Sequence, residues 1–330
     1  MSKKPATDVP EWCPPLLADW LEEVEDEPQW LIENFLPEEG MTLVSGHQKL
    51  TRKSFTAFAA TLAVATGKVI GPFKATRAGH VVYIEEEGTK APTKKRWEAF
   101  IRAYGLKKNK VDCRFAFRAG IGLDTEVWRK RLLEYVDYFE PALIVFDNLS
   151  FMHSGDENSN NDMRAVVSTL QLIRNAGTAT LFLAHLSKSA GSDPKEDIDK
   201  QVRGGSIVVN GYDVHWALRN YVGEHAPIDL IVRYRDLGGR QFTVDWKMKH
   251  QKDSELLDEV TLAMRERYDE WDPRFSIECL AQLERGKAYG VEDLKRVWKS
   301  SRKAAQEVVD RLVAAKSIKH NKQTGRYEVL

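Results

Sequence analysis

A lysine and a serine, Lys53 and Ser54, end a polar string, GHQKLTRKS, that begins at Gly46. A Walker A loop cradles phosphates with backbone N–H groups and places its lysine on the β and γ phosphates and its hydroxyl on Mg²⁺. Lys53 and Ser54 fit these two roles, and Lys49 and Arg52 add positive charge. Gly46 lies one residue too early for the usual pattern, and Arg52 stands where a residue with positive φ is often needed. The string therefore predicts an irregular phosphate-binding loop; the alternative is a lysine-rich surface loop that caps a helix.

An aspartate and a histidine each follow an apolar run that is typical of a buried strand. Asp147 follows residues 142–146, and His185 follows residues 179–183. Parallel sheets place ligand-binding groups at the carboxyl ends of their strands. Asp147 could therefore support Mg²⁺ together with Ser54, and His185 could sense the γ-phosphate. The plainer interpretations are a turn aspartate and a structural histidine.

Three consecutive glutamates, Glu85, Glu86 and Glu87, follow the apolar run 80–84. A carboxylate at the end of such a strand could orient and deprotonate an attacking water. Glu87 is the preferred candidate, and Glu85 and Glu86 compete for the role. The alternative is a solvated acidic turn.

Arg233 and Arg235 lie in a predicted strand, on one face because side chains alternate along a strand. They could reach the nucleotide of a neighbouring subunit as an arginine finger. Equally, they could only pair with surface acids.

The elements that would position these side chains alternate between strand-like runs and helix-period stretches. This alternation predicts a parallel α/β sheet with crossover helices. From Val202 the pattern becomes antiparallel, with a hairpin across Gly238-Gly239. The four apolar runs that carry the prediction are residues 41–45, 80–84, 142–146 and 179–183.

The C-terminal part has a different pattern. Residues 251–272 are charged and predict a helical connector, and three short helical segments at 275–283, 291–298 and 301–315 then precede a strand, a polar turn and a strand. Three helices and a hairpin form a winged-helix pattern, which binds DNA or serves as a protein-docking module. The residues that would contact DNA are Arg302 and Lys303 on the third helix and Lys319, Lys322 and Arg326 on the wing.

Composition describes a soluble folded protein of 330 residues with 49 basic and 49 acidic residues. No apolar run approaches the roughly 20 residues that span a bilayer, and the first residues lack the apolar core of a secretory signal. The three cysteines lie far apart, which argues against a disulfide framework or a zinc site. We therefore expect a cytoplasmic protein with no membrane partner.

The charge is unevenly distributed along the chain. Residues 1–40 hold eleven acidic and two basic residues, whereas residues 301–330 hold seven basic and three acidic residues. The basic end favours an anionic partner, although a solvated helix face would have the same composition.

Taken together, the motifs resemble RecA-fold ATPases of the RepA-like group, which are AAA-family ATPases related to DnaB-type hexameric helicases. The resemblance covers roughly residues 28–248 and includes VVYIEEEG, LFLAHLSKSAG and VRGGSIVVNGYDVHWALR. Its most specific part is FDNLSFMHSGDENSNNDM, because the family typically follows its Walker B aspartate with a small-polar, acidic, Asn-rich segment. The chain departs from the family in lacking the glycine before Lys53 and in having Ala184-His185 where many relatives have two histidines.

The resemblance implies ATP and Mg²⁺ as ligands and a RecA-like P-loop core. Together with the charge and the patterns along the chain, it predicts a division into an acidic N-terminal arm (1–27), an ATPase domain (28–250), the connector (251–272) and the winged-helix-like segment (273–330), which resembles winged-helix domains in general. The roles that it implies are nucleotide binding by Lys53 and Ser54, Mg²⁺ support by Asp147, catalysis by Glu87, γ-phosphate sensing by His185 and an arginine finger at Arg235.

The leading hypothesis is a DNA-associated ATPase of a phage or mobile element, acting as a replicative helicase or as a replication or recombination factor. We expect a homo-oligomer, which could form a ring. The polar segment 189–205, with Lys195, Lys200 and Arg203, would contact single-stranded DNA. One alternative is a DNA-binding regulator or scaffold with a degenerate nucleotide site. Another is a nucleotide-gated signalling ATPase that binds no nucleic acid.

Overall fold

The structure, a computed structural model, describes most of the chain. The described residues are 13–25, 27–47, 51–186, 199, 202, 205–219, 228–235, 238–252, 256–267, 276, 279–298 and 300–330. Lys49, Lys195, Lys200 and Arg203 lie outside them.

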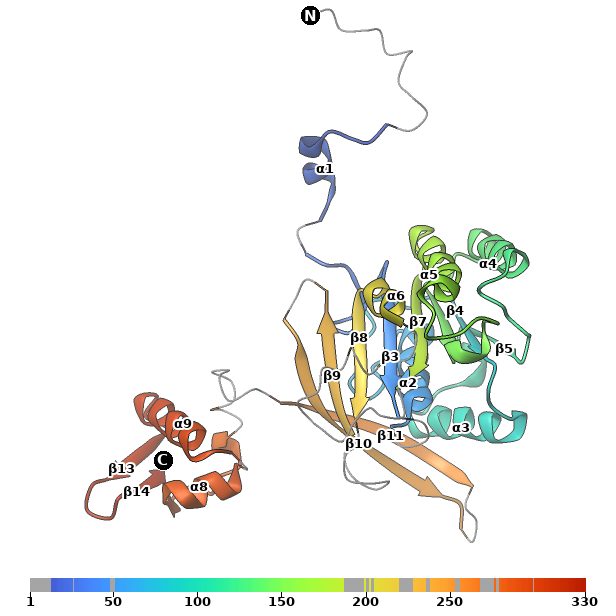
Figure 1. Ribbon diagram of the computed structural model, residues 1–330. Helices are drawn as coiled ribbons and strands as arrows, with labels where there is room; N and C mark the ends of the chain where they lie inside the picture. The colour runs from blue at the N-terminus through green and yellow to red at the C-terminus, as the bar shows by residue number, and fades with distance from the viewer. Residues whose placement is uncertain are drawn as a thin grey trace, which may run out of the picture.

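A nine-stranded sheet, in the order β11-β10-β9-β8-β3-β7-β6-β4-β5, forms the centre of the larger unit (Figure 1). The strands from β8 to β5 are parallel, and β8, β9, β10 and β11 pair antiparallel. The strands are β3 (Met41–Gly46), β4 (Val81–Glu85), β5 (Cys113–Phe117), β6 (Leu143–Asp147), β7 (Ala179–His185), β8 (Val214–Arg219), β9 (Ile228–Tyr234), β10 (Arg240–His250) and β11 (Leu257–Arg267). A short hairpin, β1 (Trp30–Ile32) and β2 (Leu36–Pro37), precedes β3.

Helices cover both faces of this sheet. Side chains alternate across each buried strand, so that Tyr83 of β4 joins the apolar cluster under α2 and α3, and Ile84 joins the cluster under α4, α5 and α6. These helices are α2 (Lys53–Thr66), α3 (Lys90–Ala103), α4 (Glu126–Phe139), α5 (Asn160–Asn175) and α6 (Gly205–Gly211), with short 3-10 turns at η2 (Lys108–Lys110) and η3 (Leu149–Phe151). The predicted α/β class, with a mostly parallel sheet, is confirmed.

The four strands predicted from apolar runs are β3, β4, β6 and β7. The predicted hairpin across Gly238-Gly239 joins β9 and β10. In contrast, β5 and α4 were not anticipated. The region after Val202 is also not simply antiparallel. It first forms the helix α6, whose Val208 packs in the apolar cluster under α4 and α5. It then forms β8, which is parallel to β3.

The prediction of a helical connector over residues 251–272 is wrong. β11 pairs antiparallel with β10 from Leu257↔His250 to Arg267↔Gln241. Val260 and Leu262 are buried while their neighbours along the strand are more exposed, so the apolar side chains recur with the strand period of two. The sheet therefore extends to Arg267.

The C-terminal part has its own small core. A three-stranded sheet, β12-β14-β13, combines with two helices at the predicted positions of the second and third helical segments. The elements are β12 (Ala288–Tyr289), α8 (Val291–Val297), α9 (Arg302–Ala314), β13 (Ile318–Asn321) and β14 (Arg326–Val329). Leu294, Trp298 and Val308 are buried among them.

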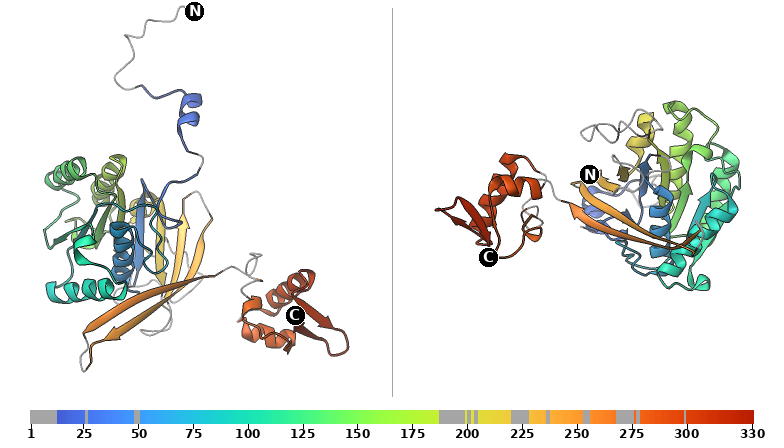
Figure 2. Two further views of the ribbon diagram at one scale, coloured as in Figure 1. Left: turned by 180° about the vertical axis from the view of Figure 1, so that it is seen from behind. Right: turned by 90° about the horizontal axis from the view of Figure 1, so that it is seen from below.

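In its described residues the N-terminal arm holds the short helix α1 (Leu17–Glu23), drawn in dark blue in Figures 1 and 2. None of its residues is buried. In the described part of the chain, no helix is long and apolar enough to cross a membrane.

Candidate nucleotide-binding site

Four neighbouring strands bring the predicted residues to one edge of the sheet. In the order β3-β7-β6-β4, the strands end at Gly46, His185, Asp147 and Glu85. Gly46 is level with His185, and Glu85 is level with Asp147. The carboxyl edge of the parallel strands is therefore where polar side chains converge, as the topology requires.

The loop between β3 and α2 makes close backbone contacts. A Cβ atom on Gly46 would lie 2.3 Å from Thr51 Oγ1 and 3.0 Å from the Leu218 carbonyl oxygen, so this position requires glycine. Arg52 has φ 54° and ψ 41°, the left-handed conformation, directly before α2 begins at Lys53. The residue thus adopts the positive φ that the usual glycine supplies, with a strain of about 1 to 2 kcal/mol. The first N–H groups of the 14-residue α2 follow this turn, an arrangement that suits a bound phosphate.

Lys53 is buried at the edge between β3 and β7. Its Nζ donates to the Gly46 carbonyl oxygen at 2.8 Å and lies 3.2 Å from His185 Nδ1. Burial lowers the pKa of Lys53 to about 8, although the charges of Asp147 and Glu87 oppose the shift. The buried ammonium group has already lost much of its hydration. Binding an anion there therefore costs little additional desolvation free energy.

Asn148 joins the catalytic candidates. The Ser150 N–H donates to Asn148 Oδ1, which fixes the amide orientation. Asn148 Nδ2 then donates to Glu87 Oε2 at 2.6 Å and faces His185 Nε2 at 2.8 Å. A neutral His185 that accepts this bond carries its proton on Nδ1, the nitrogen that faces the Lys53 ammonium. Two proton-bearing nitrogens directed at each other favour an anionic oxygen that accepts from both.

The three glutamates have different environments. Glu85 is buried and accepts from the N–H groups of Glu87 and Gly88. Glu86 binds the loop after β5, where its carboxylate accepts from three N–H groups between residues 119 and 121. Glu87 alone of the three contacts the network, through Asn148 and through His185 Nε2 at 3.9 Å.

Asp147 provides oxygen ligands beside Ser54. It accepts from Tyr83 Oη at 2.6 Å and from the Ser54 hydroxyl, and it is buried. Burial raises the pKa of Asp147, and burial together with the charge of Asp147 raises the pKa of Glu85 to about 7.

A carboxylate, a hydroxyl and phosphate oxygens are hard donors that suit Mg²⁺, so Ser54 and Asp147 fit this ion. No group of three or more His, Cys, Asp or Glu side chains arranged to hold a metal occurs within the described ranges.

Arg233 of β9 and Arg235, directly after the end of β9, do not join this site. Arg235 donates to the carbonyl oxygens of Asn210 and Tyr212 and pairs with Asp213, directly before β8. The start of β8 is level with the start of β3, so Arg235 lies at the opposite edge of the sheet from Gly46. It cannot serve the site of its own chain.

Arg233 belongs to a second polar network, partly exposed, that sequence reasoning missed. Asp199 accepts from Arg233 Nη1 at 2.8 Å and lies 2.9 Å from Nδ1 of the buried His215, whose Nε2 lies 2.7 Å from Ser45 Oγ. This network reaches β3 one residue before Gly46.

Asn148 and Tyr83 were also missed at the nucleotide site. The available signals were a carboxamide directly after Asp147 and a tyrosine on the strand that ends at Glu85. Neither residue type is distinctive alone, because the role of each depends on which strands are neighbours.

The predicted DNA-contacting residues of the C-terminal part are all exposed: Arg302, Lys303, Lys319, Lys322 and Arg326. Arg302 and Arg326 lie 3.7 Å and 3.4 Å from acids at the start of α8.

The match to a protein family agrees with a nucleotide-binding core. Residues 8–191 match the AAA_25 family, which is described as an AAA domain. No curated protein shows a significant sequence match. Among solved structures, the chain is similar to a KaiC-like protein from the hyperthermophilic archaeon Pyrococcus horikoshii OT3, with 13% identity and a TM-score of 0.44, over 70% of this chain and 93% of that one.

Proposed function

Since the chain belongs to the AAA_25 family of AAA domains, we propose that it is a DNA-associated ATPase, a replicative helicase or a replication or recombination factor of a phage or mobile element. The observation that carries the ATPase part is the Lys53–His185–Asn148–Glu87 network at the carboxyl edge of the parallel strands.

The residues of this network have separate tasks in the proposed reaction. Lys53 and His185 Nδ1 donate to oxygens of the transferred phosphoryl group and stabilise the charge that develops there. Glu87 orients the attacking water and accepts its proton, while Asn148 holds both Glu87 and His185 in position. Mg²⁺, held by Ser54 and Asp147, would supply charge neutralisation at the phosphates.

We further propose that a neighbouring subunit completes the site. Arg235 lies at the sheet edge opposite Lys53, with a side chain that is 46% exposed. In a head-to-tail assembly such an arginine meets the nucleotide of the next subunit, and this arrangement forms a ring when the rotation closes.

We propose that the C-terminal part is a winged helix and contacts DNA. A second DNA contact is proposed for the segment with Lys195, Lys200 and Arg203. Support comes from the exposed basic residues of α9 and of the β13–β14 hairpin.

The test is phosphate release by the full-length protein with Mg²⁺, with and without single-stranded DNA. We expect ATP turnover that single-stranded DNA stimulates. DNA binding without turnover would favour the scaffold alternative instead, and turnover with no DNA binding at any salt concentration would favour the signalling ATPase.

A further inference from the structure

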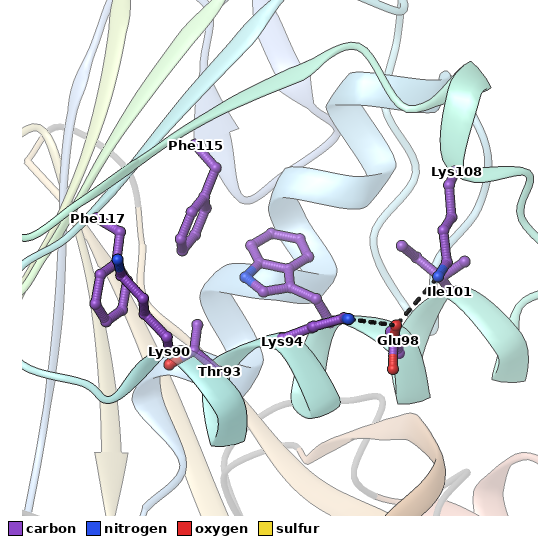
Figure 3. Close-up of a pocket in the computed structure, with 9 residues that line it drawn as sticks. Lys90, Thr93, Lys94, Glu98, Ile101, Lys108, Phe115 and Phe117 are labelled. Carbon is purple, nitrogen blue, oxygen red and sulfur yellow. Dashed lines mark hydrogen bonds and ion pairs between the residues drawn. The ribbon is translucent and has the colours of Figure 1, made fainter.

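A cavity of about 500 Å³ lies between α3 and the edge strand β5, on the outer side of the α3 layer. Its lining combines three aromatic side chains, Trp97, Phe115 and Phe117, with three lysines, Lys90, Lys94 and Lys108. Figure 3 shows the side chains of Phe115 and Phe117 pointing from β5 toward α3, the helix that carries Lys90 and Lys94. No task in the proposed ATPase reaction uses these residues.

The roughly parallel rings of Phe115 and Phe117 form an aromatic platform. Phe115 stacks on Tyr83 with centroids 5.6 Å apart and lies beside Phe117 at 6.2 Å. Trp97 meets the Phe115 ring edge-on. Phe115 remains 42% exposed, although most aromatic side chains of the sheet are buried. An exposed ring held rigidly by its neighbours is suited to stacking against a flat ligand.

Positive charge surrounds the platform. Residues 90–118 contain ten lysines and arginines but only two acids, Glu98 and Asp112. Glu98 is shared by Lys94, Lys95 and Lys108, at 4.0, 3.6 and 3.1 Å. One carboxylate cannot neutralise three ammonium groups, so the cavity attracts an anion.

Two polar atoms of the lining residues are unsatisfied. Thr93 Oγ1 and Trp97 Nε1 are buried without a hydrogen-bond partner. A buried donor without a partner is destabilising by about 1 to 3 kcal/mol. Both atoms belong to side chains that line the cavity, so this lining suits a ligand with hydrogen-bond acceptors better than an apolar ligand.

We propose that the cavity between α3 and β5, from here on called the groove, binds single-stranded nucleic acid. Bases would stack on Phe115 and Phe117, and phosphates would bind the lysines. This combination of aromatic platforms and a basic groove is how proteins bind single strands with little sequence preference. The groove follows α3 from Lys90 to Ile101, about 16 Å at 1.5 Å per residue, which is longer than the single base of a mononucleotide. The inference deepens the proposed DNA association, and it does not require ATP turnover.

The test uses the full-length protein and a fluorescein-labelled oligothymidylate of about 12 nucleotides. Phe115→Leu and Phe117→Leu keep apolar bulk but remove the stacking face, and each is expected to weaken binding about tenfold or more. Lys94→Ala combined with Lys108→Ala is expected to lower the slope of log affinity against log salt by about 1 to 2. The matched controls on α4, Tyr138→Leu (78% exposed) and Lys130→Ala, leave both quantities unchanged.

Three results would overturn the proposal. The first is wild-type oligonucleotide affinity in all groove variants. The second is a raised KM for ATP with unchanged oligonucleotide affinity, which would assign the groove to the base of ATP. The third is loss of self-association in the groove variants without any effect on the oligonucleotide, which would assign the groove to a second copy, for example to its acidic helix α1. Basal ATP turnover of the same preparations separates these results from a failure of the ATPase proposal itself.

Discussion

At the scale of single residues, two adjacent glutamates have different tasks in the proposed reaction. Glu87→Gln is expected to lower kcat by about 100-fold or more while nucleotide binding remains, because the amide cannot accept a proton from water. Glu86→Gln is the matched control, since the Glu86 carboxylate is bound by backbone N–H groups near Gly120. It should stay within about twofold of wild type in steady-state phosphate release. Equal losses in the two variants would contradict the assignment.

Arg52 allows a test of backbone strain in the loop. Arg52→Gly and Arg52→Ala both remove the side chain, and so they differ mainly in how well each tolerates φ 54°. We expect the glycine variant to be more stable than the alanine variant by about 1 kcal/mol, the reverse of the usual helix preference. Urea unfolding of the two variants measures this difference. A more stable alanine variant would show that the left-handed turn does not form.

At the scale of elements, two neighbouring strand ends bring two acids together. Burial raises the pKa of Glu85 to about 7, with the charge of Asp147 as the next cause, against about 4.3 in an unfolded chain. The folded state therefore holds this proton more tightly than the unfolded state does. Stability contributed by the protonated form is present at low pH and is lost as the pH rises through 7.

Glu85→Gln tests this coupling, because glutamine keeps an acceptor for the Glu87 and Gly88 N–H groups. We expect the substitution to raise the free energy of unfolding at pH 8 by about 1 to 2 kcal/mol and to have a much smaller effect at pH 5. Urea unfolding in the presence of a chelator measures both values. The same effect at both pH values would contradict the pKa shift.

The sequence predicts the elements that have one dominant period. The buried parallel strands are short apolar runs, so β3, β4, β6 and β7 could be located, and with them Lys53, Asp147 and His185. β11 has the strand period too, but Val260 and Leu262 are its only buried residues and an alanine interrupts its charged positions, so its period is weak. Its partner β10 stabilises it, and no local signal reveals that pairing.

The networks could not be predicted for the same reason. Asn148, after β6, contacts Glu87 only because β4 is one neighbour of β6. It contacts His185 only because β7 is the other neighbour of β6. Sequence could place each strand end at an edge but could not give the order of strands. That order is a property of the whole sheet.

At the scale of the whole molecule, the distance between Lys53 and Arg235 across the sheet predicts complementation between subunits. Lys53→Ala and Arg235→Ala should each abolish turnover alone. Mixed one to one before assembly, they should recover up to about a quarter of the wild-type rate, because about one interface in four then pairs an intact Lys53 with an intact Arg235. A mixture as inactive as its components would contradict a partner-completed site.

In the proposed reaction the irregular loop before α2 is a working phosphate-binding site, and a comparison of three proteins tests this. ATP hydrolysis is measured for the wild type, for Lys53→Ala at the start of α2, and for Lys68→Ala just after its end. We expect wild-type turnover for Lys68→Ala and a loss of about 100-fold or more for Lys53→Ala. Equal turnover in all three proteins would show that ATP is hydrolysed without this loop and would contradict the proposed site.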